Sequence, residues 1–103
     1  MGTGERVVNL RKLARDRECT VRIPGVCCGD PATTVLAHFR LAGVSGIGMK
    51  SPDLVGAWAC RECHDAIDRR GHMDLDRDHV RLAHAEGMAR TINTLIREGV
   101  ITA

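Results

Sequence analysis

Four of the five cysteines in this sequence have the spacing of a metal site. Cys60 and Cys63 form a C-x2-C pair, which points both sulfur atoms at a single tetrahedral ion. Cys19 and Cys27 can supply two further thiolates, because the turn signal at Pro24-Gly25 folds the chain back between them. We therefore expect a closed structural Zn²⁺ site with four cysteine ligands.

The fifth cysteine, Cys28, directly follows Cys27. Adjacent side chains of an extended segment point in opposite directions, so both cannot be ligands of one ion. Cys27 is the expected ligand and Cys28 the spare thiol, although the spacing alone permits either choice.

Disulfide bonds are the alternative use of these cysteines. An odd number leaves one cysteine unpaired, and the first residues show no apolar segment of a secretory signal. The longest weakly polar run, residues 54–60, is far shorter than the roughly 20 residues that cross a bilayer. We therefore expect a cytoplasmic protein with no membrane partner, and a reducing compartment favours metal binding.

A second group of candidate ligands begins beside the C-x2-C pair. His64 and Asp68 are four residues apart in a predicted helix, so their side chains share one face and can bind one divalent cation. Asp65 is the alternative carboxylate, but it faces about 100° away from His64. His38 precedes this group, near the end of a predicted strand. Three other histidines have no partner at ligand spacing and are expected at the surface: His72, His79 and His84.

The elements that must position these residues are short and separated by turns. Asn9 can cap a helix that reaches about Arg17. Residues 19–23 alternate with β-branched side chains before the Pro24-Gly25 turn, as in a hairpin or a knuckle. Strands are expected over residues 33–39 and 57–60, with one helical turn over residues 53–56 between them.

Two longer helices complete the expected fold. One covers residues 61–70 and ends at Gly71. The other begins at Asp76 or Asp78, ends near Glu98 and is followed by Gly99 as a stop signal. Its apolar side chains recur at steps of three and four, and this stripe either packs on the zinc core or forms a homodimer contact. The stripe consists of Ala85, Met88, Ile92 and Leu95.

Composition sets further bounds. A chain of 103 residues predicts one domain, residues 1–103, with residues 1–8 as a loose leader. Phe39 and Trp58 are its only aromatic residues, so we expect zinc binding to contribute to folding.

Arginine provides 13 of the 15 basic residues, and the positive excess lies in residues 1–40, where a basic face is expected. Guanidinium groups suit bidentate contact with phosphate. The glycine-rich segment 43–50 is no Walker A loop, because Met49 stands where glycine must precede the lysine.

In chain order, His38, Asp53 and His64 lie on a strand, a loop and a helix beside the cysteines, which is the ββα-metal or HNH nuclease pattern. The sequence resembles the small prophage-encoded nucleases of the YbcO type over roughly residues 9–103. The segments that carry the resemblance are Arg17-Glu-Cys-Thr-Val-Arg-Ile-Pro-Gly-Val-Cys27, Ala37-His38, Lys50-Ser-Pro-Asp-Leu54, Ala59-Cys-Arg-Glu-Cys-His-Asp-Ala-Ile-Asp-Arg-Arg70 and Glu86-Gly-Met-Ala-Arg-Thr91.

The resemblance implies a small zinc-stabilised α+β domain of the HNH or His-Me finger class, with a long C-terminal helix over residues 76–98 packed on the core. It also implies a metal-dependent endonuclease that hydrolyses DNA phosphodiester bonds, in phage DNA processing or recombination in a bacterial cell.

The resemblance also assigns roles to single residues. His38 would be the general base, and His64 with Asp68 would hold Mg²⁺ or another divalent cation. Asp53, at a position usually occupied by asparagine, would brace the loop and orient the base. Ala37 stands where related sites often have another metal ligand, which leaves only two protein ligands. Phosphate contacts are expected from Arg40, Lys50, Arg61, Arg69 and Arg70.

Two other classes of function remain open on the sequence. The chain can be a zinc-stabilised module that binds nucleic acid without cutting it, or a phage accessory protein that contacts other proteins through its long helix. The orientation of His38 relative to His64 and Asp68 discriminates the nuclease from the binding module, because catalysis requires all three to face one cleft.

Overall fold

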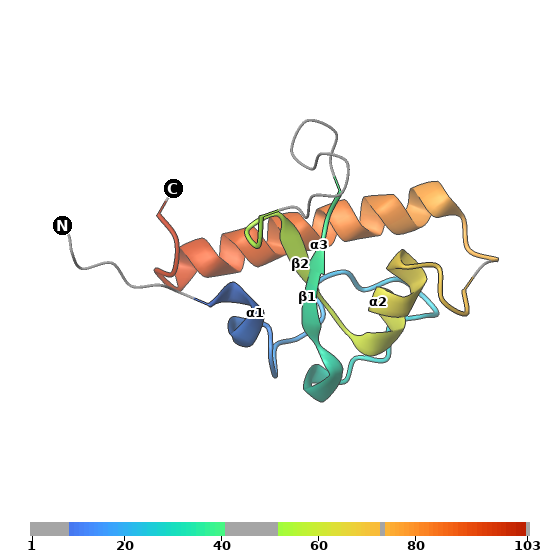
Figure 1. Cartoon of the computed structure of the whole chain (residues 1–103), viewed down its shortest axis with the longest axis horizontal. Helices are drawn as coiled ribbons and strands as arrows, with labels where there is room; N and C mark the ends of the chain where they lie inside the picture. The colour runs from blue at the N-terminus through green and yellow to red at the C-terminus, as the bar shows by residue number, and fades with distance from the viewer. Residues whose placement is uncertain (1–8, 41–51, 73, 103) are drawn as a thin grey trace.

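The structure is a computed structural model that describes residues 9–40, 52–72 and 74–102. Its elements are α1 (Leu10–Leu13), η1 (Pro31–Thr33), β1 (Val35–His38), β2 (Gly56–Ala59), α2 (Arg61–Ile67) and α3 (Arg77–Arg97). The two strands cross the long helix α3, with α1 and α2 on either side of them in the view of Figure 1. The expected small α+β arrangement with a long C-terminal helix is confirmed.

The two strands form an antiparallel sheet that places His38 at the end of β1. The register pairs Val35 with Ala59 and His38 with Gly56. β1 starts later than the sequence predicts because Asp30 caps the 3-10 turn η1 and Pro31 begins it, which takes Thr33 out of the strand. The expected helical turn over residues 53–56 is instead a tight turn, closed by the Val55 amide donating to the Pro52 carbonyl at 2.9 Å.

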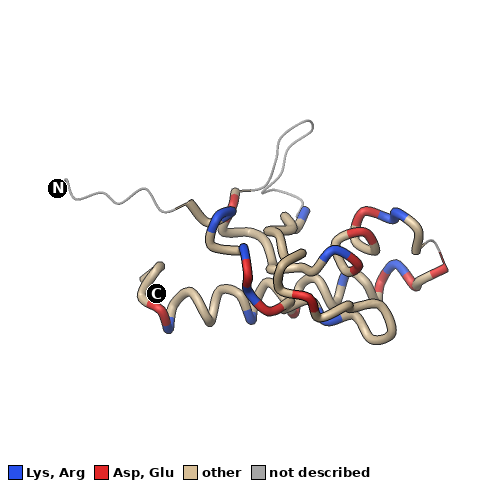
Figure 2. Tube along the Cα trace, turned by 90° about the horizontal axis from the view of Figure 1, so that it is seen from below, with Lys and Arg blue, Asp and Glu red and all other residues tan. Residues whose placement is uncertain are grey.

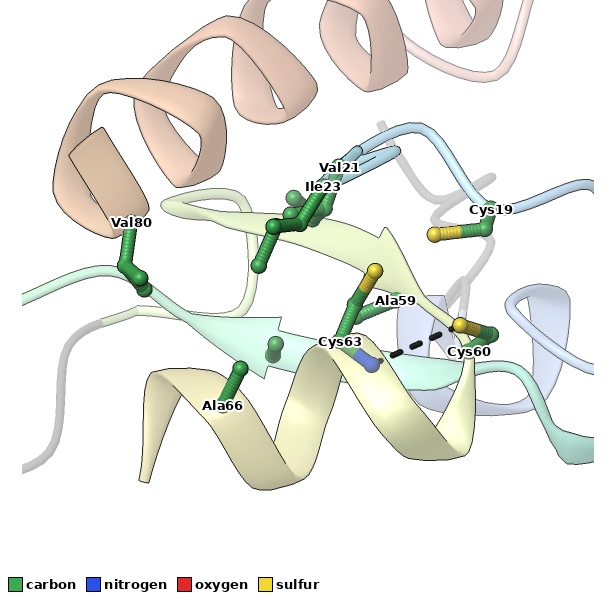
Figure 3. Packing of buried hydrophobic residues seen from close by; sticks show 10 residues of the cluster. Cys19, Val21, Ile23, Ala59, Cys60, Cys63, Ala66 and Val80 are labelled. Atoms are coloured by element: carbon green, nitrogen blue, oxygen red, sulfur yellow. Dashed lines mark hydrogen bonds between the residues drawn. The ribbon is translucent and has the colours of Figure 1, made fainter. Parts of the chain in front are cut away.

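Every residue of β2 is buried, and its alternate side chains belong to two different apolar clusters. Ala57 and Ala59 join the cluster that contains the buried cysteines. Figure 3 shows Ala59 among them. Trp58 joins the other cluster with Ala14 and Leu95. The period of two in a strand therefore divides the core into a small-residue half beside the cysteines and a half built around the tryptophan.

The buried face of α3 differs from the predicted apolar stripe. The helix is capped by Asp76, one of the two expected caps, and its buried residues are Val80, His84, Gly87, Thr91 and Leu95. Of the predicted stripe only Leu95 is fully buried, where it packs with Trp58, while Met88 packs at the edge of the cysteine cluster. Two of the four stripe residues therefore pack within the chain, the homodimer contact stays a prediction, and the most buried line of the helix is partly polar.

Gly87 explains how α3 comes so close to the segment that carries Cys19. A Cβ atom at Gly87 would lie 2.9 Å from the Cα atom of Val21. Only glycine permits this approach of backbone to helix. Of the hairpin or knuckle expected at residues 19–23, no hairpin strand forms, because Arg22 has a left-handed backbone with φ of 53° that breaks the extended run.

A closed ring of hydrogen bonds provides partners for the backbone amide and carbonyl of Trp58 at the edge of β2 that faces away from β1. The Trp58 amide donates to Thr91 Oγ1 at 3.1 Å, and the Thr20 hydroxyl donates to the Trp58 carbonyl at 2.9 Å. The two hydroxyl oxygens lie 2.9 Å apart, so the Thr91 hydroxyl is left to donate to Thr20. Buried backbone groups need such partners, and here two threonines from distant segments supply them.

The two shorter helices end earlier than predicted. α1 stops at Leu13, although Asn9 caps it as expected. α2 stops at Ile67 because Arg69 takes the left-handed conformation (φ 60°) that the sequence assigns to Gly71. Residues 1–8 and the glycine-rich segment with Lys50 lie outside the described residues. Among the residues described, no helix is long and apolar enough to cross a membrane.

Candidate functional site

The sulfur atoms of Cys19, Cys27, Cys60 and Cys63 all lie within 4.8 Å of one another. Cys27 Sγ and Cys60 Sγ are 3.7 Å apart. A tetrahedral Zn²⁺ with Zn–S bonds of 2.3 Å separates its sulfur ligands by about 3.8 Å, so the cluster has the size and the donor set of a structural zinc site. Of the two adjacent cysteines, Cys27 belongs to this cluster, whereas Cys28 is exposed and outside it.

Turns at both ends of the cluster position the thiols. Cys60 is the N-cap of α2, and its Sγ accepts a hydrogen bond from the Cys63 amide at 3.5 Å. Ile23 closes the other turn, where its carbonyl accepts from the Cys27 amide at 2.9 Å. Figure 3 shows the sulfurs of Cys19, Cys60 and Cys63 on the same side of the cluster, between the 19–23 segment and α2. The expected knuckle between Cys19 and Cys27 is present.

The thiols of the cluster interact strongly with one another. Hydrogen bonding from the Cys63 thiol lowers the pKa of Cys19 to about 4. Burial raises the pKa of Cys27 to about 11, and the neighbouring Cys19 sulfur raises the pKa of Cys63. Close contact between Cys19, Cys27 and Cys63 thus favours a proton on some of these sulfurs and not on others, whereas a divalent cation binds cysteines as thiolates.

His38 and Asp53 form the first pair of the second site. His38 Nε2 lies 2.8 Å from Asp53 Oδ1, and Arg11 Nε lies 3.2 Å from the same oxygen. Hydrogen bonding with His38, and then Arg11, lowers the pKa of the Asp53 carboxyl. Asp53 is therefore ionised at neutral pH. The pair has the geometry of a carboxylate that orients an imidazole.

His64 and Asp68 form the second pair. His64 Nε2 lies 3.4 Å from Asp68 Oδ2, and the Asp68 amide donates to the His64 carbonyl at 3.0 Å, so the four-residue spacing works as expected. Ligands at 90° around a cation with bonds of 2.0–2.1 Å are about 3.0 Å apart, which is close to this separation. Arg70 Nη2 also binds Asp68 Oδ2, at 2.7 Å.

His38 of the first pair and both residues of the second pair line one cleft, whereas Asp53 does not. Its first part, with a volume of about 360 Å³, is lined by His38, His64 and Asp68 together with Arg11 and Arg40. A second part of about 250 Å³ shares His38, Arg40 and Asp68 with the first and extends toward α3. The three residues whose orientation discriminates a nuclease from a binding module therefore face the same cleft. Asp65 lines neither part.

The basic residues that were expected to contact phosphate lie in different places. Arg40 and Arg69 line the cleft. Arg69 is half-buried and donates to the Leu75 carbonyl at 3.0 Å, whereas Arg70 pairs with Asp68. Arg61 is exposed but lines neither part of the cleft. Lys50 lies outside the described residues.

Sequence reasoning missed four residues of the cleft: Arg11, Arg77, Arg81 and His84. His84 is not a surface residue as expected; it is 5% exposed, and its Nε2 lies 2.9 Å from the Ala37 carbonyl. Burial lowers the pKa of His84, so its ring is neutral and donates to that carbonyl. His84 is four residues after Val80 and three before Gly87, and positions at this spacing share a helix face. This spacing was the sequence feature that could have predicted the burial of His84.

In the described residues near the N-terminus, ion pairs interrupt the expected basic face. Arg11 and Arg17 are each paired with a carboxylate, of Asp53 and Glu98 respectively. Figure 2 shows blue and red segments mixed along most of the described chain. The arginines of the cleft come from both halves of the sequence, so the sum of charges along the chain did not locate them.

A family model described as "Putative nuclease YbcO" matches residues 8–100. The chain belongs to the YbcO family. This YbcO-family chain is 55% identical over 97 residues to "Putative nuclease YbcO" of Escherichia coli (strain K12), covering 94% of this chain and 100% of that protein. It has the same identity and coverage with "Putative nuclease ybcO" of Enterobacteria phage 82.

A solved structure is also similar to this YbcO-family chain. It is described as "Structure of a putative bacteriophage protein from Escherichia coli str. K-12 substr. MG1655". The two share 52% sequence identity and a TM-score of 0.75, over 88% of this chain and 100% of that one. Membership of the family confirms the resemblance found in the sequence and supports a nuclease at a coarse level.

Proposed function

We propose that this protein is a metal-dependent endonuclease of the HNH class that hydrolyses DNA phosphodiester bonds. The observation that carries the proposal is the common cleft of His38, His64 and Asp68, flanked by arginines. One relative belongs to a phage, which supports a role in phage DNA processing or recombination inside the bacterial cytoplasm.

His38 is the proposed general base. With Nε2–H donated to Asp53 Oδ1, the neutral ring carries its lone pair on Nδ1, the atom that can take a proton from water. The Asp53 carboxylate then stabilises the imidazolium that forms. Asp53 thus does for this site what an orienting carboxylate does in other His-based mechanisms.

His64 and Asp68 are the proposed ligands of the catalytic cation. One imidazole and one carboxylate leave most positions of an octahedral ion to water and substrate oxygens, a pattern common for Mg²⁺. A bound divalent cation stabilises charge on the phosphate and on the departing 3′ oxygen. The four cysteines would hold a structural Zn²⁺ that fixes the first turn of α2, where His64 directly follows Cys63.

The decisive experiment is a cleavage assay on linear, supercoiled and branched DNA, with RNA as a separate arm. Metal-depleted protein that retains its zinc should cut only after addition of Mg²⁺ or Mn²⁺. His38→Ala should abolish cutting, whereas His79→Ala, an exposed histidine of α3 outside this cleft, should leave it intact. Full activity of His38→Ala would remove His38 as the base.

A nucleic-acid-binding module without catalysis is the second candidate, and two observations favour it. Among the described residues, the four cysteines are the only group of three or more potential ligands close enough to share an ion. Arg70 also occupies Asp68 Oδ2. Binding of DNA by the wild-type protein without cleavage under any of these conditions would establish this alternative.

A further inference from the structure

The part of the cleft next to α3 contains an arginine held in place on an aromatic ring. The Arg81 guanidinium lies over the Phe39 ring, 4.4 Å from its centroid. Arg81 Nη2 also donates to the Arg40 carbonyl at 3.0 Å. Stacking and one hydrogen bond fix the plane of the guanidinium while leaving its other N–H donors available, which suits recognition of phosphate oxygens.

Arg77 lies one helical turn before Arg81 on the same face of α3 and lines the same part of the cleft. Both arginines are exposed, and within the described part of the chain neither forms an ion pair. The acidic residue that lines this part of the cleft is Asp68, which Arg70 already binds. The part of the cleft next to α3 therefore has an excess of positive charge that no carboxylate of its lining neutralises.

His84 ties this arginine pair to the proposed base. Its ring packs edge-on against Phe39, with centroids 5.0 Å apart, and Nε2 donates to the carbonyl of Ala37, the residue before His38. The aromatic ring that supports Arg81 is thus fixed to the end of β1. The distance between the arginine pair and His38 is set by packed, buried groups rather than by a loop.

We propose that Arg77 and Arg81 form a phosphate subsite that binds the backbone phosphate of a polynucleotide next to the one that enters the His38 end of the cleft. The inference rests on the proposed function and deepens it. It defines the substrate as a chain with at least one phosphate beyond the scissile one, because Arg77 and Arg81 line only the part of the cleft next to α3, whereas His64 lines only the other part. Preorganised Arg81 lowers the entropic cost of binding that second phosphate.

The test measures DNA binding over a range of salt concentrations by fluorescence anisotropy of a labelled duplex. His38→Ala is the parent, so that cleavage does not deplete the probe. Removal of one phosphate contact should reduce the slope of log K against log salt by about 0.9. Arg77→Ala and Arg81→Ala should each show this reduction with several-fold weaker binding. Arg97→Ala removes an exposed arginine at the far end of α3 and should match the parent.

Cleavage assays in the wild-type background separate this inference from the proposed function. Arg77→Ala should raise KM for a long duplex with little change in kcat, since within the described residues the Arg77 side chain forms no ion pair or hydrogen bond that holds the cleft together. Unchanged salt slopes for both variants, in a protein that cuts DNA, would overturn the subsite and spare the nuclease. Reduced slopes in a protein that binds but never cuts would overturn the nuclease and support the subsite. No DNA binding at all would overturn both.

Discussion

The His38 imidazole and the Asp53 carboxylate form a hydrogen-bonded pair, with 2.8 Å between Nε2 and Oδ1, that joins the end of β1 to the turn before β2. Arg11, next to the start of the described chain, binds the same carboxylate oxygen. Three segments thus converge on one oxygen atom. The pair fixes the orientation of the imidazole before any substrate enters the cleft.

Replacement of Asp53 tests this orienting role. Asp53→Ala leaves the His38 ring free to rotate, and a misplaced catalytic group costs about 10²-fold in rate. Asp53→Asn retains an oxygen that accepts the hydrogen bond and should keep more activity than the alanine variant. The measurement is kcat for DNA cleavage by both variants at saturating Mg²⁺. Equal activity of Asp53→Ala and wild type would show that the pair has no catalytic role.

Removal of metal tests the cysteine cluster. Elemental analysis should find about one zinc per chain, and each of Cys19, Cys27, Cys60 and Cys63 should be unreactive toward a thiol reagent in the native protein. Cys60→Ser should lose the zinc and unfold, because metal binding at such sites contributes about 10–16 kcal/mol, as much as a domain's whole stability. Cys28→Ser, at the exposed cysteine, is the matched control and should keep both zinc and fold. Five reactive thiols in the native protein would contradict the site.

The sequence was most informative where one residue type at fixed spacing determines a contact. The C-x2-C pair with Cys19 and Cys27 predicted the cluster, and the spacing of His64 and Asp68 predicted their pairing. The capping residues Asp76 and Asp78 predicted the start of α3 to within one turn, and the structure shows Asp76 as the cap, with its side chain accepting from two amides of the first turn. In each case the interaction is local, or its geometry is imposed by one turn.

The sequence was least informative where long-range packing decides. The buried line of α3 contains His84, Gly87 and Thr91, which look polar or neutral in a hydrophobicity pattern. Their burial depends on partners far away in the chain: the Ala37 carbonyl, the Val21 backbone and the Trp58 amide. The arginines of the cleft were missed for the same reason, since α3 reaches β1 only in the folded chain.

Thr91→Val tests the hydrogen-bond ring at the edge of β2. Valine fills nearly the same volume but leaves the buried Trp58 amide without its acceptor, which should cost about 1–3 kcal/mol of unfolding free energy. Urea denaturation at fixed zinc measures the loss. Thr94→Val is the control, because that hydroxyl donates only to the Arg90 carbonyl within α3 and should cost much less. Equal effects of both changes would mean that the ring is not a source of stability.

Gly87→Ala tests the close approach of α3 to the Cys19–Val21 segment. Alanine favours a helix by about 1 kcal/mol over glycine, but its Cβ would sit 2.9 Å from Val21 Cα. Overpacking of a rigid backbone costs about 1–3 kcal/mol, so a net loss of stability is expected. Asn93→Ala, at an exposed position of the same helix, should instead raise stability by a few tenths of a kcal/mol. A more stable Gly87→Ala protein would show that the helix can move away.

The Arg17–Glu98 pair gives a prediction for pH. The Arg17 guanidinium binds both carboxylate oxygens of Glu98, and this hydrogen bonding lowers the pKa of Glu98 from its ordinary 4.5. A carboxylate with a lowered pKa stabilises the folded state above the ordinary value, and the contribution disappears as the pH falls through the lowered pKa. Glu98→Gln should therefore melt below wild type at pH 7, and the difference should shrink toward zero below about pH 4.5.

Release of zinc in acid affects wild type and Glu98→Gln alike, so the difference between their melting temperatures isolates the ion pair. Glu18→Gln, at an exposed carboxylate without an ion pair among the described residues, should melt with wild type at every pH. Because Arg17 also stacks on Trp58, 4.6 Å from the ring centroid, the pair holds the end of α3 against the tryptophan cluster. A pH-independent difference would assign the loss in Glu98→Gln to packing rather than to charge.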